Sequence, residues 1–450
     1  MKTIAKLLLT ICIMSTLFSL ASCSMGDLNA SDGYFSGGMG DMGGMLGVSP
    51  APDAEGDSMD VPESGTEGEP EKDDTVEPED KPDEIITLPA GMITAGTWND
   101  NDNYNMWCNL FVQGEDNGKF FGYTVPSASW GFNSLKRVKV TVTNGEDVVA
   151  GAKVVASDEQ GNTLFSAITD AQGKAYIFTE EDNGSVTVTS GSGSSTAEFN
   201  SESRDLTVNL DNNAEKRDVI EIMFVVDVTG SMGDEISFLK AELADVVNKI
   251  AANNSGAAIK LALLFYRDTN DNVPFDYYDF VDVTTEVGLS AQQNAINKQY
   301  ATGGGDYPEA VDEALELAVN KQWSTGATTK LIFQVLDAPA HNGNKYKEKF
   351  FNATKIAAEK GIRICPIICS GAAEGAEYTM REAAIYTGGT FIFVTDDSGI
   401  GGSHHDPNLP NATIELLNSM LVRLVNGYHT GVFADPIYWK EDPNLGTNNQ

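Results

Sequence analysis

The chain contains 450 residues, and its 29 lysines and arginines against 66 aspartates and glutamates give a formal net charge of −37. This charge argues against a nucleic-acid-binding protein, because contact with the phosphate backbone requires clustered lysine and arginine side chains. The length allows two or three domains, at least one of them with a sizeable hydrophobic core.

The N-terminus has the pattern of a secretion signal. Lys2 and Lys6 precede the apolar run "LLLTICIMSTLFSL", whose short length favours a signal peptide over residues 1–22 rather than a membrane-spanning helix. The following "LASC", which ends at Cys23, resembles the lipobox of bacterial lipoproteins. That resemblance implies cleavage before Cys23 and lipidation of its thiol, with a lipid as the only membrane anchor and the protein exposed outside the cytoplasm. An ordinary secretory signal with an incidental cysteine is the alternative.

Residues 23–89 are predicted to form a disordered linker. A Gly/Met-rich stretch leads into residues 51–84, which hold fifteen acidic residues, five prolines and no aromatic residue. Such a segment buries too little apolar area to offset its ordering entropy, and its charges repel one another. Residues 90–134 are rich in aromatic residues and are expected to pack on a neighbouring domain. Their "NDNDNYN" stretch favours a polar turn over a calcium loop, because it lacks the later Gly and Glu of an EF-hand.

Residues 135–212 have an all-β pattern. Short runs of alternating apolar and polar residues are separated by turn signals, such as Asn144-Gly145, and predict a small antiparallel β-sandwich. The pattern "AGAKV…G…TDAQGKAYIF" resembles the carboxypeptidase-regulatory-like, immunoglobulin-like modules of secreted proteins. The resemblance implies a structural or accessory module that contributes no catalytic residues.

From residue 217 to 430, apolar strands alternate with amphipathic helices. The predicted strands are "DVIEIMFVVD", "AIKLALLFYRD", "KLIFQVLD", "IRICPIICS" and "TFIFVTD". The helical segments include "GDEISFLKAELADVVNKIAAN" and "YPEAVDEALELAVNK", with Pro308 near the first turn of the latter. This alternation predicts an α/β doubly wound domain, whose parallel sheet is covered by helices on both faces. Residues 431–450 remain as a C-terminal tail.

Two cysteines lie in the fourth of these strands. Cys365 and Cys369 are four residues apart, which is about 13 Å along a strand. A disulfide requires Cα atoms within about 7 Å, so these two residues are not expected to pair with each other.

Oxygen-bearing side chains follow the first strand of this domain. Asp227, Thr229 and Ser231 are spaced two apart in "DVTGS", and Gly230 permits a tight turn between them. Ligands of open α/β sheets bind beyond the carboxyl ends of the strands, and hard oxygen ligands suit Mg²⁺, Mn²⁺ or Ca²⁺. The sequence therefore predicts a divalent-cation site here, although Asp227 as the N-cap of the following helix is the alternative.

Three ordered motifs carry a resemblance to a known family. "DVTGS" matches the DxSxS/DxTxS signature of von Willebrand factor A domains, which have a Rossmann-like fold. "ATGGGDYPEAVDEAL" and "VLDAPAHNG" are similar to the GGGDxPE and DAPxHG elements of a subset of these domains. The resemblance implies a metal-ion-dependent adhesion site in which Asp227, Thr229 and Ser231 are ligands. It also implies that Asp337 acts on the metal, commonly through a water molecule.

The middle element departs from the family pattern. The usual threonine ligand is matched most closely by Gly305, so Asp306 beside it is taken as the replacement ligand, with Thr302 as the less favoured candidate. A second acidic ligand would reduce the excess positive charge of the metal and weaken its attraction for a partner's carboxylate. Asp268 and His341 lie near the same rim, where we expect turn-capping and loop hydrogen bonds rather than metal binding.

The sequence contains no recognisable catalytic motif. A nucleophile elbow and a Walker motif are missing, and the residues of "SHHD" are adjacent in sequence, which is not the geometry of a catalytic triad. We therefore expect a non-enzymatic, surface-anchored lipoprotein that binds a protein or other extracellular ligand through its cation, using a carboxylate or another oxygen of the partner. The alternative is a scaffold or assembly subunit of an envelope complex with a purely structural metal.

Overall fold

The computed structural model describes residues 90–114, 118–211, 218–254, 256–305, 307–325, 328–399, 403–404, 407, 409–410 and 412–446. The predicted signal peptide, Cys23, the linker over residues 23–89 and Asp306 lie outside the described residues. The described residues all belong to one compact unit, Pro82–Gln450. None of the helices in these ranges combines the length and the apolar character that a membrane crossing requires.

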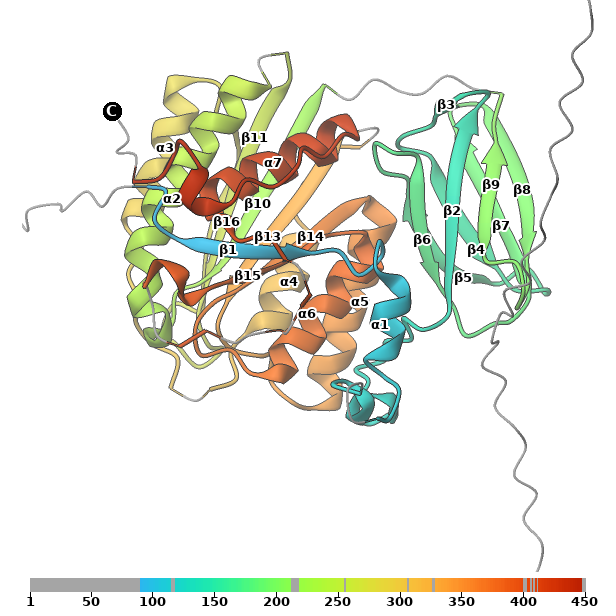
Figure 1. Ribbon diagram of the computed structural model, residues 1–450, viewed down its shortest axis with the longest axis horizontal. Helices are drawn as coiled ribbons and strands as arrows, with labels where there is room; N and C mark the ends of the chain where they lie inside the picture. The colour runs from blue at the N-terminus through green and yellow to red at the C-terminus, as the bar shows by residue number, and fades with distance from the viewer. Residues whose placement is uncertain are drawn as a thin grey trace, which may run out of the picture. The chain divides into compact units, whose positions relative to one another are not determined.

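An eight-stranded sheet organises the larger part of the unit, with strand order β12-β11-β10-β13-β14-β15-β1-β16 (Figure 1). Its five parallel strands correspond to the predicted apolar runs. They are β10 (Val219–Asp227), β11 (Ala258–Tyr266), β13 (Thr329–Leu336), β14 (Ile362–Ile368) and β15 (Phe391–Val394). Every residue of β13 and β14 is buried, as strands covered on both faces require. The predicted α/β architecture is confirmed.

The prediction of a purely parallel sheet is wrong at both edges. β12 (Phe275–Asp282) runs antiparallel to β11, and its half-exposed side chains are typical of an edge strand. At the other edge, β1 (Thr94–Trp98) runs antiparallel between β15 and β16 (Glu415–Leu416). The aromatic-rich segment therefore supplies a strand of the sheet. Its pairing could not be read from local periodicity, because residues 99–218 separate it from the next strand of that sheet.

Helices cover both faces of the sheet (Figure 1). One face carries α2 (Gly233–Asn253), α3 (Glu286–Asn297) and α7 (Leu417–Thr430), and the other carries α4 (Val311–Val319), α5 (Asn344–Lys360) and α6 (Glu374–Thr387). The predicted apolar stripe of α2 is buried against the first face; it consists of Ile236, Leu239, Leu243, Val246, Val247 and Ile250. Because α4 begins at Val311, Pro308 lies three residues before the helix, near its first turn as predicted.

Residues 137–209 form two further four-stranded sheets. One has the order β3-β2-β6 with β9 paired to β2, and the other has the order β5-β4-β7-β8. Their strands are β2 (Arg137–Asn144), β3 (Asp147–Val148), β4 (Lys153–Ser157), β5 (Thr163–Ile168), β6 (Lys174–Phe178), β7 (Gly184–Ser190), β8 (Gly193–Phe199) and β9 (Asp205–Asn209). Alternate residues, such as Val138, Val140 and Val154, are buried in one apolar cluster. The β2–β9 pair is parallel, so the arrangement is not wholly antiparallel as predicted.

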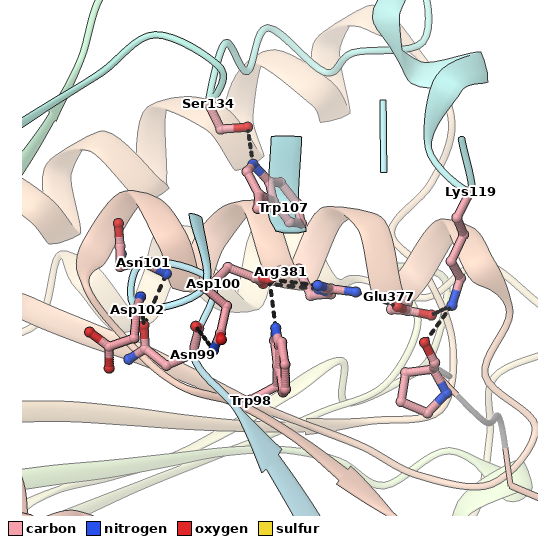
Figure 2. Close-up of polar contacts among 12 residues, drawn as sticks. Trp98, Asn99, Asp100, Asn101, Asp102, Trp107, Lys119, Ser134, Glu377 and Arg381 are labelled. Atoms are coloured by element: carbon pink, nitrogen blue, oxygen red, sulfur yellow. Dashed lines mark hydrogen bonds and ion pairs between the residues drawn. The ribbon is translucent and has the colours of Figure 1, made fainter. Parts of the chain in front are cut away.

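Buried polar contacts hold the segment after β1 against α6 (Figure 2). Arg381 of α6 donates hydrogen bonds to both oxygens of Asp100, at 2.9 and 2.5 Å, and to Glu377 at 2.9 Å. Trp107, in α1 (Tyr104–Asn109), lies with its ring centroid 5.1 Å from the guanidinium of Arg381. Its indole N–H donates to Ser134, whose hydroxyl donates to the buried Glu382 at 2.9 Å. The network thus joins segments that are far apart in the sequence.

The start of β1 is held by α2. The backbone N–H groups of Gly91, Met92 and Ile93 donate to the carboxylate of Glu242 at 3.0, 2.8 and 3.1 Å. The C-terminal tail returns to the same place, because the N–H of Gly446 donates to the carbonyl of Gly91 at 3.0 Å. The α/β part of the molecule therefore includes residues on both sides of the range 217–430.

Two smaller sequence predictions concern local structure. The "NDNDNYN" stretch begins with a turn, before α1 starts at Tyr104; Asn99 Oδ1 accepts from the N–H groups of Asn101 and Asp102 at 3.0 and 3.1 Å, in keeping with the predicted polar turn. Cys365 and Cys369 are both buried, and no disulfide joins them.

Candidate functional site

The loop after β10 brings three oxygen-bearing side chains together. Asp227 is the last residue of β10 and is 0% exposed. Its Oδ1 accepts hydrogen bonds from the N–H and the hydroxyl of Thr229, at 2.8 and 2.7 Å. The Thr229 hydroxyl lies 3.1 Å from that of Ser231, which belongs to the short 3₁₀ helix η2 (Gly230–Met232). The N-cap of α2 is Met232, so Asp227 does not cap that helix.

Asp337 lies at the same edge of the sheet. It follows β13 directly, and β13 is the parallel neighbour of β10, so the two carboxyl ends are adjacent. Asp337 is 3% exposed. Burial, followed by repulsion from Asp337, raises the pKa of Asp227 to about 7, although the hydrogen bonds from Thr229 oppose the shift. Two acidic residues therefore share a poorly solvated site.

A glycine loop packs over these residues. Gly303, Gly304 and Gly305 have φ values of +80°, +85° and +128°, a region that residues with a side chain rarely adopt. The N–H of Gly230 donates to the carbonyl of Gly303 at 3.2 Å, and a Cβ atom at Gly304 would lie 3.3 Å from Thr229 Cβ. The loop thus approaches the first motif closely because it lacks side chains.

The two candidates for the middle ligand have different outcomes. Asp306 directly follows the glycine loop but lies outside the described residues, so its assignment stays a prediction. Thr302 is exposed, and its backbone N–H donates to the carbonyl of Val228 at 3.0 Å. Its own carbonyl accepts from Arg267 at 3.0 Å. The backbone of Thr302 therefore joins the loop to the site.

Glu309 is an acidic residue of the site that the sequence analysis did not assign. It is 3% exposed, and its N–H donates to the carbonyl of Pro339 at 3.0 Å. Its Oε1 lies 2.7 Å from the position that a Cβ atom at Gly304 would take. Burial, and then repulsion from Asp227 and Asp268, raises the pKa of Glu309 to about 9. The available signal was its place in "GGGDYPE", where it is the acidic residue after the proline.

Hydrogen-bonded side chains form the rim of the site. His341 Nε2 lies 2.7 Å from Asp268 Oδ1, which is the loop hydrogen bond that we expected for His341. Asp271 Oδ2 accepts from the N–H groups of Asp268 and Gly304, at 3.1 and 2.9 Å. These contacts fix the loops around the site and occupy the carboxylates of the rim.

The available oxygen atoms fit a hard divalent cation. Asp227 Oδ2 and Glu309 Oε2 are buried and have no hydrogen-bond partner among the described residues. A buried negative charge without a partner is costly, and a bound cation would remove that cost. In the same ranges, no three carboxylate, imidazole or thiol side chains converge closely enough to hold a metal ion. The hydroxyls of Thr229 and Ser231 would therefore be needed to complete a coordination shell.

Comparisons with known proteins match part of the chain. Residues 221–395 match the family model described as von Willebrand factor A domain. Alpha-protein kinase vwkA of Dictyostelium discoideum is 26% identical over 129 residues, which cover 28% of this chain and 19% of the kinase. The putative ariadne-like RING finger protein R811 of Acanthamoeba polyphaga mimivirus is 28% identical over 145 residues, covering 31% of this chain and 13% of that protein. This chain therefore spans less than a fifth of the length of either relative.

Solved structures show weaker similarity. The conserved hypothetical protein BatB from Bacteroides thetaiotaomicron has a TM-score of 0.29 and 15% identity, covering 39% of this chain and 89% of BatB. The pilus adhesin SpaC from Lactobacillus rhamnosus GG has a TM-score of 0.36 and 10% identity, covering 56% of this chain and 34% of SpaC. Similarity at these values carries no functional argument. On the family match, residues 221–395 form a von Willebrand factor A domain.

Proposed function

We propose that the chain is a surface-anchored lipoprotein whose von Willebrand factor A domain binds a protein ligand through a divalent cation. The observation that carries this proposal is the environment of Asp227. Its carboxylate is buried, one oxygen has no hydrogen-bond partner in the described part, and two hydroxyls lie beside it at the carboxyl edge of the sheet. Ligands of open α/β folds bind at that edge.

Asp227, Thr229 and Ser231 would hold the cation directly, with Asp337 and Asp306 as further candidate ligands. The bonds from Thr229 to Asp227 Oδ1 fix the carboxylate in place and leave Oδ2 for the cation. Ser231 is exposed, whereas Asp227 and Thr229 are buried, so a partner would approach from the side of Ser231. A bound cation would supply an electrophilic position for an oxygen of that partner.

Exposed side chains around the site support a protein ligand. Tyr300 is 65% exposed and Tyr307 is 49% exposed, and they flank the glycine loop in the sequence. Aromatic residues are enriched in protein interfaces, where tyrosine supplies a large contact area and a hydroxyl. These tyrosines are therefore proposed to contact the partner beside the cation.

The other parts of the chain are proposed to present this domain. Lipidated Cys23 would anchor the protein, and the acidic linker would hold the folded part away from the membrane. The two sheets of residues 137–209 would form a carboxypeptidase-regulatory-like β-sandwich that acts as an accessory module. We propose no enzymatic activity and no contact with nucleic acid.

A pull-down from the native envelope tests the proposal. The full chain, the Asp227→Ala variant and the control Asp182→Asn, which changes an exposed carboxylate on the β region, are compared with and without EDTA. We expect the natural chain and the control to retain a partner that EDTA releases, and Asp227→Ala to retain none. If the partner is retained in the presence of EDTA and also by the Asp227→Ala variant, the result would contradict a metal-dependent adhesion site.

A second candidate function is a scaffold or assembly subunit with a structural metal. The observation in its favour is that Asp227 and Thr229 are 0% and 1% exposed, as a fully enclosed ion would require. Melting curves separate the two candidates. A structural metal predicts a large fall in Tm with EDTA while partner retention is unchanged, whereas an adhesion site predicts lost retention with a modest fall in Tm.

A further inference from the structure

The side chain of Glu309 accepts no hydrogen bond within the described residues, whereas each of the other buried glutamates has at least one donor, although Glu382 Oε2 also lacks a partner. The others each have a hydrogen-bond donor: Glu221 has Ser324, Glu242 has three backbone N–H groups, Glu377 and Glu415 have arginines, and Glu382 has Ser134. Glu309 Oε2 accepts no hydrogen bond in these ranges, although only 3% of the residue is exposed. A buried carboxylate is costly to ionise without a positive charge or a donor beside it, so the Glu309 side chain is suited to a site that binds a cation.

Glu309 lies close to the residues of the candidate cation site. Its Oε1 and the Cβ of Thr229 both lie close to Gly304, at 2.7 and 3.3 Å from the position that an added Cβ atom would take. Its backbone forms an isolated bridge to Ala340, three residues after Asp337. Glu309 therefore lies between the loop that carries Asp227 and the loop that carries Asp337.

Nearby positive groups are already engaged by other partners. Arg267 donates to the carbonyls of Thr302 and Tyr300, at 3.0 and 3.4 Å. His341 is bonded to Asp268 at 2.7 Å. Within the described ranges, no lysine, arginine or histidine forms an ion pair with Glu309. No cationic side chain of the described residues therefore stabilises an ionised Glu309.

We propose that Glu309 supplies a further negative charge to the cation site, by accepting a hydrogen bond from a water molecule bound to the cation. The proposal rests on the proposed function, because it requires a cation at Asp227. A water-mediated role agrees with the finding that no three carboxylates of the described residues converge closely enough to hold a metal directly. Carboxylates that contact a metal ion through its bound water orient that water and raise metal affinity.

The charge of the site then limits the chemistry of the partner. A bound cation favours the ionised forms of Asp227, Asp337 and Glu309, and their three formal negative charges against its two positive charges leave a net charge of −1 before Asp306 is counted. A partner carboxylate would be repelled at such a site, because few mobile ions screen charges that are buried together. The inferred partner therefore offers a neutral oxygen, such as a serine or threonine hydroxyl or an amide carbonyl.

Mn²⁺ binding measured by isothermal titration calorimetry tests the role of Glu309. The variant Glu309→Gln preserves the shape of the side chain, and Glu316→Gln makes the same chemical change at an exposed position of α4. We expect Glu309→Gln to weaken Mn²⁺ affinity by about tenfold or more, as loss of such an indirect contact does elsewhere, and Glu316→Gln to leave it unchanged. Circular dichroism checks that both variants are folded.

The outcomes separate this inference from the proposed function. Equal Mn²⁺ affinity in Glu309→Gln and the natural protein would overturn the role of Glu309 and leave the adhesion site intact. Absence of Mn²⁺ binding by the natural protein at millimolar concentration would overturn both. A loss of affinity that Glu316→Gln reproduces would also overturn it, because the effect would then reflect overall charge.

Acetate serves as a probe for the partner's chemistry. In the Mn²⁺-loaded protein, a carboxylate that binds the metal displaces water and lowers the water-proton relaxation enhancement. We expect acetate to leave this enhancement unchanged in the natural protein and to lower it in Glu309→Gln, where one negative charge is gone. An equal decrease in both proteins would overturn the inferred preference for a neutral oxygen.

Discussion

Two regions of this molecule bury several carboxylates, and they treat them in opposite ways. At α6, Asp100 and Glu377 surround the buried guanidinium of Arg381, and Lys119 contacts Glu377 at 2.5 Å (Figure 2). At the carboxyl edge of the sheet, Asp227 and Glu309 are equally buried, but no lysine, arginine or histidine of the described residues forms an ion pair with either of them. The first region joins one segment to another through ion pairs, whereas the second contains carboxylates without an ion-pair partner among the described residues.

This difference separates a structural cluster from a candidate binding site. Both regions contain the same residue type at similar burial, so burial alone does not indicate function. The distinguishing property is whether the protein itself supplies the compensating charge. Four experiments test this difference, beginning with the substitution that should change stability most.

Replacement of Arg381 by methionine tests the ion-pair network at α6. Removal of the guanidinium leaves Asp100 and Glu377 buried without their main partner, so we expect the free energy of unfolding to fall by about 3–5 kcal/mol. Urea denaturation measures the change. The exposed pair Lys153–Glu359 provides the control, because Lys153→Met is expected to change stability by less than about 1 kcal/mol. Equal effects of the two substitutions would contradict a structural role for the network.

Addition of a cation tests the site at the carboxyl edge of the sheet, where Asp227 and Glu309 lie. At about 100 times its Kd, Mn²⁺ is expected to stabilise the natural protein by about 2.7 kcal/mol. The Asp227→Asn variant should gain nothing from Mn²⁺, and without metal it should be no less stable than the natural protein, because a buried charge has been removed. Thermal unfolding with and without Mn²⁺ measures both effects. A metal-free Asp227→Asn protein that is much less stable would show that the carboxylate has a structural role.

The pH dependence of stability tests Glu382, a member of the structural network. Burial raises its pKa from 4.5 to about 8. Between these two pH values, Glu382 is protonated in the folded state and ionised in the unfolded state. The contribution of Glu382 to the free energy of unfolding is therefore fully present below pH 4.5 and is lost as the pH rises through 8. The loss is at most about 1.4 kcal/mol per pH unit. Glu382→Gln should have a shallower decline between pH 6.5 and 8. Urea denaturation at several pH values measures the two slopes, and identical slopes would contradict the assignment.

The variant Glu242→Gln tests a buried carboxylate whose hydrogen-bond donors are backbone N–H groups. It accepts from the N–H groups of Gly91, Met92 and Ile93, so Glu242→Gln exchanges charge-assisted hydrogen bonds for neutral ones. We expect a loss of about 1 kcal/mol. Hydrogen exchange at residues 91–93 should accelerate more than exchange in β13, and uniform acceleration would argue against a local clamp.

Local sequence patterns predicted a large part of this fold. The apolar runs of β10, β13 and β14 and the apolar stripe of α2 are buried as their periodicity requires. Asp227, Thr229 and Ser231 are close in the sequence, so a single tight loop brings them together. Each of these features depends on residues within one strand, helix or turn.

The edges of the sheet and part of the site could not be predicted in this way. The residues of β1 do not indicate that this strand pairs with β15 and β16. The sequence around Arg381 likewise does not indicate that Asp100 is its partner. Glu309 lies within a quoted motif, yet its importance depends on being buried beside Asp227 without a partner.

The α/β architecture and the first loop of oxygen ligands follow from the sequence alone, because the hydrophobic period of a strand or helix and the spacing of a tight turn involve only a few neighbouring residues. The strand that completes the sheet and the ion pairs of the buried carboxylates become known only from the folded chain. Strand pairing and ion pairing depend on distances in space between segments that are far apart along the chain.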